Sequence, residues 1–218
     1  MADVPQQLPR TLWIGLLLVL VMLCLAYALS LMELNRVHQH AMPVLGPVAD
    51  FMLTNQDGAA TTLAALSNRV WVADIIFTRC AGSCPIMSRQ MASLQAALPP
   101  TSRARLVTLT TDPDFDTPPV LKKYSERFGA NSNRWTFLTG PKLEIGKLAA
   151  NSLKLSAVPV KPEEQKDPAD LFIHSTIFVV VDKQARLRGT FETEGDGVDW
   201  TNALSRIVTA VNQLEHEK

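Results

Sequence analysis

Two of the three cysteines lie close together in the sequence, and their spacing suits either redox chemistry or metal binding. Cys80 and Cys84 are separated by three residues in the stretch FTRCAGSCP, and Pro85 follows the second cysteine. This spacing is one residue wider than that of the C-x-x-C dithiol motif. The pair therefore predicts either a redox site of wider reach or a site that holds an ion between two sulfurs.

Pro85, which follows Cys84, predicts that Cys84 lies at the start of a helix. Because proline is favoured in the first turn of a helix, we expect a helix over 85–98 with Cys84 at its N-terminus. Free N–H groups and the helix dipole should there lower the pKa of the Cys84 thiol. A disulfide between Cys84 and Cys80 would close a short loop and stabilise the folded chain by only about 2 kcal/mol. This small stabilisation favours a switchable bond over a structural one. A structural zinc site is disfavoured, since it needs four ligands and no second cysteine pair exists.

His174, in DLFIHSTIFVV, is a candidate third ligand because it ends a long loop just before an apolar strand. Two thiolates and one imidazole form a low-coordinate set suited to Cu(I), and the same donors can hold Cu(II). The simpler alternative for a lone histidine is a hydrogen bond to a backbone carbonyl.

The elements that must position these residues alternate between strand and helix patterns. Their order predicts an α/β, thioredoxin-like fold with a central, mostly parallel sheet, helices on both faces and a terminal β-hairpin. Sites in such sheets lie at the carboxyl ends of strands, where Cys80 and Cys84 are expected. The expected elements are a hairpin at 51–63, buried strands at 69–77, 105–111 and 134–140, helices at 85–98, 118–128 and 141–153, a strand, turn and strand at 175–192, and a helix from about 199.

The N-terminal region predicts a membrane anchor. Leu12 to Met32 contains no charged residue and is long enough as a helix to cross a hydrocarbon core of about 30 Å. A cleaved signal peptide is the alternative, because residues 26–28 read AYA, but the apolar run is longer than a signal core. The short tail before the span favours an N-inside orientation in a bacterial inner membrane, with a periplasmic domain. The expected parts are a cytoplasmic tail (1–11), a transmembrane anchor (12–34), a linker (35–46) and a thioredoxin-like domain (47–218).

The balanced charge of the chain and its isolated metal-donor residues bear on which partners and ligands are expected. The 218 residues carry 21 basic and 21 acidic side chains, which argues against nucleic acid as a partner. Cys24 lies within the apolar run and is expected to face lipid or to fill space in helix packing. His38, His40 and Met42 are copper-capable donors just after the run, although a solvated linker explains them more simply. His216 is expected at the surface.

Four motifs occur together in this sequence: FTRCAGSCP, TTDPDFDTPPVLKKY, WTFLTG and IHS before a strand. Together they resemble the motifs of the SCO/SenC copper proteins, which are membrane-tethered, thioredoxin-fold proteins that serve assembly of the copper centre of cytochrome c oxidase. The resemblance implies that Cys80, Cys84 and His174 are copper ligands. It also implies the copper-centre subunit of the oxidase as a partner, with other copper chaperones or thioredoxin-like reductants as further partners. The sequence departs from many members by having Ala81, Gly82 and Ser83 between the cysteines.

Three aspartates surround these motifs. Asp74 lies six residues before Cys80, the spacing at which thioredoxins keep a buried aspartate beneath their redox pair. A desolvated carboxylate there would have a raised pKa and could accept a proton during disulfide exchange. A solvent-facing or ion-paired Asp74 is the alternative. Asp112 and Asp116 match the family motif and could border the site, although turn and capping roles explain them equally well.

Two classes of function therefore remain. In the first, the protein is a copper metallochaperone that uses Cys80, Cys84 and His174. In the second, it is a thiol-disulfide oxidoreductase that reduces cysteines of an exported partner, such as the oxidase copper subunit, with Asp74 as a proton acceptor. Whether the protein is an enzyme is thus left open by the sequence. A peroxidase is disfavoured, because that chemistry needs one activated cysteine and would not explain His174.

Overall fold

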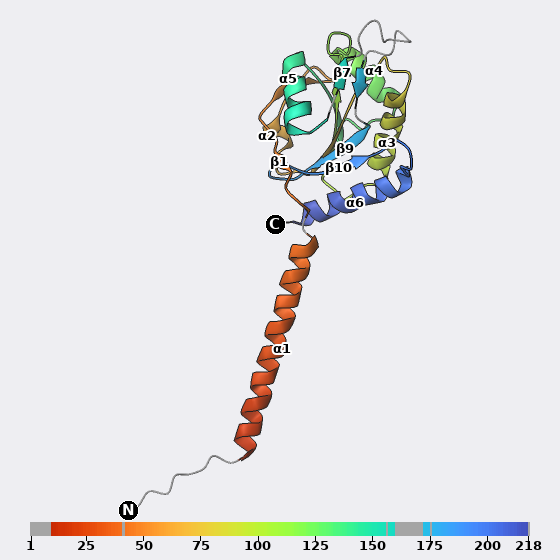
Figure 1. The fold of residues 1–218 in the computed structure, drawn as a ribbon. Coiled ribbons are helices and arrows are strands. Elements are labelled where there is room, and N and C mark those ends of the chain that lie inside the picture. The colour runs from red at the N-terminus through yellow and green to blue at the C-terminus, as the bar shows by residue number, and fades with distance from the viewer. Residues whose placement is uncertain (1–9, 41, 156, 160–171, 175, 218) are drawn as a thin grey trace, which may run out of the picture. The chain divides into compact units, whose positions relative to one another are not determined.

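The chain divides into two compact units, Met1–Met42 and Pro43–Lys218 (Figure 1). The computed structural model describes the backbone of residues 10–40, 42–155, 157–159, 172–174 and 176–217, and the side chains of residues 13–30, 42–155 and 176–217. The second unit contains the sheet and the cysteine pair.

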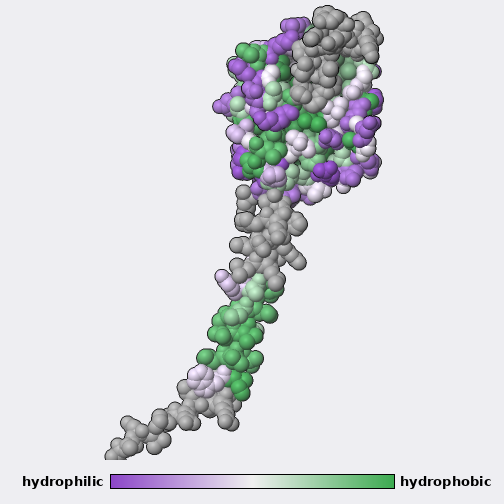
Figure 2. All heavy atoms as spheres, in the orientation of Figure 1, coloured by the Kyte–Doolittle hydropathy of each residue, from purple (hydrophilic) through white to green (hydrophobic). Residues whose placement is uncertain are grey.

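The first unit is formed by one helix, α1 (Arg10–His40). Among the described residues, it is the one helix that is long and apolar enough to cross a membrane, through the segment Trp13–Ser30. The side chains of that segment are exposed, and Figure 2 shows them as a hydrophobic surface along the helix. The helix continues through His38 and His40, so part of the expected linker is helical. The side chains of these two histidines lie outside the described residues.

One mixed sheet forms the centre of the second unit. In spatial order its strands are β1 (Gly46–Pro47), β10 (Arg186–Glu192), β9 (Ile177–Val181), β4 (Trp71–Ile76), β5 (Arg105–Thr110), β6 (Trp135–Thr139), β2 (Met52–Asn55) and β3 (Ala60–Thr62). The central strands β4, β5 and β6 are parallel, and the other neighbouring strands pair antiparallel. The expected parallel arrangement therefore holds only at the centre, because hairpin strands complete the sheet on both sides.

Helices cover both faces of the sheet (Figure 1). On one face, α2 (Leu63–Leu66), α5 (Lys142–Gly146) and the π-helical turn η1 (Lys147–Ser152) pack on alternate residues of β4 and β5. On the other face lie α3 (Ser83–Ala97), α4 (Pro118–Arg127) and α6 (Trp200–His216). Ring contacts tie α4 to β6 and α6 to β9. The expected strands and helices are thus present, and the helix expected over 141–153 is formed by α5 and η1.

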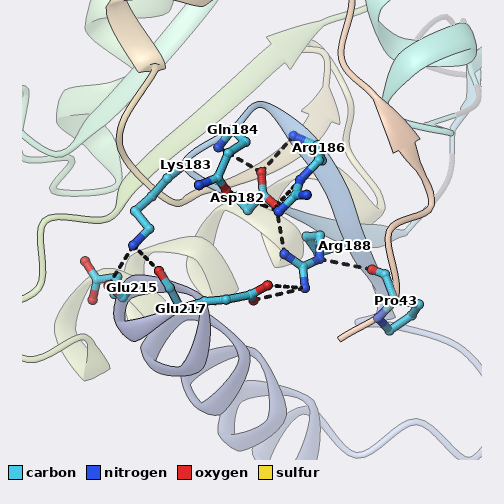
Figure 3. A network of polar contacts seen from close by, with 8 residues as sticks. All are labelled: Pro43, Asp182, Lys183, Gln184, Arg186, Arg188, Glu215 and Glu217. Atoms are coloured by element: carbon cyan, nitrogen blue, oxygen red, sulfur yellow. Dashed lines mark hydrogen bonds and ion pairs between the residues drawn. The ribbon is translucent and has the colours of Figure 1, made fainter. Parts of the chain in front are cut away.

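A buried ion-pair network joins the C-terminal hairpin to both ends of the second unit (Figure 3). Arg188, on β10, is only 2% exposed, and its guanidinium lies 2.8 Å from Asp182 and 2.9 Å from Glu217. The same guanidinium donates a hydrogen bond of 3.1 Å to the carbonyl oxygen of Pro43. Because Pro43 begins the unit and Glu217 follows α6, one side chain holds its first and last described residues together.

The charges of this network stabilise one another. Burial raises the pKa of Asp182, but hydrogen bonds from Arg186 and Arg188 outweigh that effect and lower the pKa below its usual range. Burial lowers the pKa of Arg188, but its bonds to Asp182 and Glu217 outweigh that effect and raise it. A carboxyl group with a lowered folded-state pKa stabilises the fold above its unfolded pKa of about 3.9. This stabilisation is lost as the pH falls through the folded-state pKa.

Asp182→Asn is expected to lower the free energy of unfolding by about 3–5 kcal/mol at pH 7, because the buried charge of Arg188 loses a partner. The difference from the unsubstituted protein should begin to shrink below about pH 4, where Asp182 of the unfolded chain binds a proton, and should disappear as the pH falls through the lower folded-state pKa. Urea unfolding of the full chain, followed by tryptophan fluorescence, measures both effects. Asp196→Asn, at an exposed position, is the matched control and should change stability by less than about 0.5 kcal/mol. Equal losses in the two variants would contradict the role given to the network.

Candidate functional site

The two cysteines lie in the connection from β4 to α3, at the carboxyl end of a parallel strand. Cys80 is partly exposed, whereas Cys84 is buried in the first turn of α3, and both are in the reduced thiol form. Their side chains are hydrogen-bonded to each other. The amide of Phe77 donates a hydrogen bond of 3.4 Å to the sulfur of Cys84. The structure therefore brings the predicted pair together, with one sulfur accessible and the other covered.

The expectation of a lowered pKa for Cys84 is wrong. Burial raises the pKa of this thiol far above its usual value, and the neighbouring Cys80 raises it further, against the opposing hydrogen bond from Phe77. Cys84 does lie at a helix N-terminus, since α3 begins at Ser83, two residues before the expected start. Burial outweighs the pKa-lowering effect of the helix N-terminus, because a thiolate at this position would lose its hydration.

A second loop, between β5 and α4, holds the cysteine loop through a buried carboxylate. Asp116 is fully buried and accepts a hydrogen bond of 3.1 Å from the Thr78 amide. It also accepts hydrogen bonds from the hydroxyl groups of Thr78 and Thr110. Burial raises the pKa of Asp116, and the hydrogen bonds from Thr110 and Thr78 oppose that rise. Because Thr78 lies two residues before Cys80, Asp116 fixes the backbone that leads to the accessible sulfur.

Arg79 makes a second connection between the same two loops. Its guanidinium lies 2.5 Å from the Asp112 carboxylate and its Nε donates a further hydrogen bond of 3.1 Å. The same group stacks over the Phe115 ring, 4.3 Å from the ring centroid. Arg79 is not among the residues singled out from the sequence, because an isolated arginine gives no signal of its partner. Asp112 and Asp116 thus border the site as suggested, and they do so by fastening one loop to another.

A buried polar group lies beneath the cysteines, on the face covered by α3 and α4. Asp74 is fully buried on β4 and lies opposite Thr108 on β5, which excludes the solvent-facing alternative. Its charge interacts with Cys84. The hydroxyl groups of Tyr124 and Ser88 are 2.9 Å apart. Burial raises the pKa of Tyr124 against the Ser88 hydrogen bond, and the charges of Cys84 and Asp74 add to the rise.

The third predicted copper ligand, His174, is described only by its backbone. The His174 backbone lies in β8 (Phe172–His174), which pairs with β7 (Ala157–Pro159) in a separate two-stranded sheet. The His174 side chain lies outside the described residues. Among those that are described, no group of three or more His, Cys, Asp or Glu side chains could hold a metal ion. A three-ligand site that includes His174 therefore stays a prediction.

Comparison with protein families gives a match to the SCO1/SenC model over residues 45–209. The matched range covers most of the chain and includes both Cys80 and Cys84. The chain belongs to the SCO1/SenC family. The resemblance seen in the cysteine and aspartate motifs is thereby confirmed.

Individual relatives agree with this assignment. The SCO1 protein homolog of Bacillus subtilis (strain 168) is 36% identical to this SCO1/SenC protein over 141 residues, which are 64% of this chain and 70% of the relative. A protein of Stutzerimonas stutzeri, described provisionally as copper-binding, is 27% identical over 179 residues, covering 79% of this chain and 84% of the relative. The solved structure of BsSco, a member of the Sco family of cytochrome c oxidase assembly proteins with an identified disulfide switch, has a TM-score of 0.67 at 28% identity. The structural match covers 82% of this chain and 100% of the BsSco chain. The thioredoxin-like fold is thus confirmed.

Asp116→Asn is expected to loosen the cysteine loop, because an amide accepts the hydrogen bonds of Thr78 and Thr110 less strongly than a carboxylate. The expected loss in free energy of unfolding is about 1.5–3 kcal/mol, the usual range for hydrogen bonds to charged groups. Alkylation of Cys84 by iodoacetamide should also become faster, as measured by mass spectrometry of digested protein. Asp114→Asn, at an exposed position of the same loop, should leave both quantities unchanged. Unchanged alkylation in Asp116→Asn would show that this contact does not hold the loop.

Proposed function

We propose that this SCO1/SenC protein is a membrane-anchored copper metallochaperone for assembly of the copper centre of cytochrome c oxidase. The observation that carries the proposal is the pair of hydrogen-bonded thiols, Cys80 and Cys84, at the end of β4, with one sulfur accessible. Membership of the family, the provisionally copper-binding relative and the description of BsSco as an oxidase assembly protein support it. Copper is then the cargo, and the copper subunit of the oxidase is the acceptor.

The donor atoms fit this cargo. Thiolate sulfur is a soft donor that favours Cu(I), and we assign His174 as the third ligand, with Cu(II) as an alternative charge state on the same set. Each thiol must lose its proton to bind a metal ion. Since the pKa of Cys84 is raised by burial, copper binding should release a proton and become tighter as the pH rises.

The proposed location follows from the first unit. The apolar segment Trp13–Ser30 of α1 would cross the bacterial inner membrane once, and the second unit would work on the periplasmic side. Delivery to a membrane-bound oxidase would then take place between proteins held at one surface. Other copper chaperones or thioredoxin-like reductants would load or reduce the cysteine pair.

The reduced full chain is expected to bind one Cu(I) per molecule in the presence of a competing chelator. Cys80→Ser and Cys84→Ser should each abolish this tight binding, because each removes a thiolate ligand, and the oxidised disulfide form should bind poorly. Bound copper is counted by elemental analysis after gel filtration. Cys24→Ser, which removes the thiol in α1, is the matched control and should keep full binding. Stoichiometric binding by Cys84→Ser would refute the ligand assignment.

A thiol-disulfide oxidoreductase is the second candidate, and the buried Asp74 together with the unequal exposure of the two sulfurs favours it. In this reaction the Cys80 thiolate attacks a disulfide of the partner and releases one partner thiolate. The Cys84 thiol, losing its proton to Asp74, then attacks Cys80 and frees the second partner thiolate. The products are a reduced partner and a Cys80–Cys84 disulfide. The structure of BsSco with a disulfide switch supports a redox role in a relative.

Two substitutions separate the candidates. His174→Ala should weaken Cu(I) binding and oxidase copper-centre assembly in cells, while the disulfide still forms and exchanges, because imidazole takes no part in sulfur exchange. Asp74→Asn should slow exchange with a disulfide substrate and leave copper stoichiometry unchanged. The measurements are chelator competition, oxidase activity at limiting copper, and stopped-flow exchange rates. Normal oxidase assembly in His174→Ala, alongside failure in the cysteine variants, would favour the reductase and contradict the metallochaperone.

A further inference from the structure

A polar cavity lies at the end of the sheet opposite the cysteines. It has a volume of about 400 Å³ and is formed by residues that precede β4 and β5, by the turn between β9 and β10, and by the last turn of α6. Since β4 runs from this cavity to the cysteine loop, about 20 Å of strand separates the two. The polar side chains that line it include Asn68, Arg69, Ser102, Arg103, Lys183 and His216.

The cavity has an excess of positive charge. Arg69, Arg103 and Lys183 line it, whereas Glu215 is its one lining carboxylate among the described residues. The Glu215 carboxylate already accepts a hydrogen bond of 2.7 Å from the Arg103 amide. Within the part of the chain whose side chains are described, neither Arg69 nor Arg103 forms an ion pair. Two guanidinium groups are therefore left without an anionic partner at one cavity.

Nearby arginines extend this excess. Arg105 follows the cavity at the start of β5, and its pKa is lowered by burial and by the positive charges of Arg69 and Arg134. The guanidinium of Arg134 donates a hydrogen bond of 2.9 Å to the carbonyl oxygen of Ser102, which itself lines the cavity. The chain as a whole carries no net charge, so this concentration of cations is local. Mutual repulsion of the cations would be relieved by a bound anion.

We propose that this cavity binds the phosphate of an anionic phospholipid headgroup. Guanidinium groups match the oxygens of phosphate with paired hydrogen bonds, and Arg69 and Arg103 supply two of them. Lys183 adds a point charge, and the amide of Asn68 and hydroxyl of Ser102 add neutral polar groups. This site goes beyond copper handling and rests only on the membrane-anchoring part of the proposed function.

The position of the cavity favours a lipid over a free phosphate ion. Lys183 donates a hydrogen bond of 3.2 Å to the carbonyl oxygen of Glu215 and another to that of Glu217, and Glu217 binds the same Arg188 guanidinium that holds Pro43 (Figure 3). The Arg188 network thus connects the cavity to the point at which the chain enters the second unit. Only residues 31–42 separate that point from the apolar segment of α1.

Two exposed apolar residues that follow Pro43 point to a membrane surface. Val44 is 53% exposed and Leu45 is 48% exposed, directly after Pro43. Their position is fixed, since the Leu45 amide donates a hydrogen bond of 2.8 Å to Leu187. These apolar side chains follow the residue that the Arg188 network connects to the cavity. The combination suits an interface in which the apolar side chains enter the headgroup layer and the cationic cavity binds phosphate. An acidic soluble protein as the binding partner would explain the cationic side chains of the cavity, but it would not explain why Val44 and Leu45 are exposed.

The test uses the full chain in nanodiscs of phosphatidylcholine alone or of phosphatidylcholine with phosphatidylglycerol. Hydrogen exchange is measured at the amides of Asn68, Ser102 and Arg103. Phosphatidylglycerol should slow exchange at these amides, and each of Arg69→Gln and Arg103→Gln should reduce the ratio of docked to undocked protein about fivefold. The matched control, Arg89→Gln with Lys123→Gln, removes two exposed cations from α3 and α4 and should retain the effect.

Further arms identify the source of the phosphate. Inorganic phosphate added to phosphatidylcholine nanodiscs should give little protection, and Val44→Ser with Leu45→Ser should weaken docking without loss of the fold. Protection by inorganic phosphate equal to that by phosphatidylglycerol would overturn the lipid assignment. So would exchange that is the same in both lipids, or protection that requires an acidic soluble protein. Failure of the chain to remain with any nanodisc would refute the anchor, whereas loss of Cu(I) binding alone would refute only the metallochaperone.

Discussion

The hydrogen bonds that converge on the buried carboxylate of Asp116 hold the cysteine loop to the rest of the sheet. Thr78 contributes its amide and its hydroxyl, and Thr110 contributes a second hydroxyl from the end of the neighbouring strand. Burying a carboxylate without such donors would cost several kcal/mol, so the loop and the carboxylate stabilise each other. The position of Cys80, two residues after Thr78, depends on this contact.

The parallel centre of the sheet makes that contact possible. β4 and β5 run side by side with Ile76 opposite Thr110, so the loops that follow them leave the same edge of the sheet. One loop carries the thiols and the other carries the carboxylates that bind Thr78 and Arg79. A change of strand direction here would have put these groups at opposite ends. The antiparallel strands on either side bury the central strands and carry the Arg188 network. Among the described residues, the two loops therefore form the site at this edge of the sheet.

The unequal surroundings of the two sulfurs constrain both proposed functions. Burial keeps the Cys84 thiol protonated, whereas Cys80 faces solvent and can be reached by a partner or a metal donor. For copper transfer, this arrangement couples binding to proton release at the covered sulfur. For disulfide exchange, it assigns attack to the accessible sulfur and resolution to the covered one, with Asp74 buried nearby. The same geometry would thus suit either of the two proposed reactions.

Much of the fold and part of the site follow from local features of the sequence. Apolar runs identify β4, β5 and β6 because buried parallel strands require them, and Asp57–Gly58 identifies the first hairpin through its turn chemistry. The cysteine spacing and the motif around Asp112 and Asp116 indicate the family, because each keeps its residues within one short segment.

Other features required the tertiary structure, because they join segments far apart in the chain. The partners of Arg79 and Arg188 come from loops and ends that no local pattern connects, and the antiparallel edges of the sheet depend on which hairpin joins which strand. Cys84 is the clearest case. The sequence by itself placed this thiol at a helix N-terminus and so predicted a lowered pKa, whereas the folded chain covers it and raises the pKa. Desolvation depends on every neighbour that packs around a sulfur, and only the tertiary structure decides those neighbours.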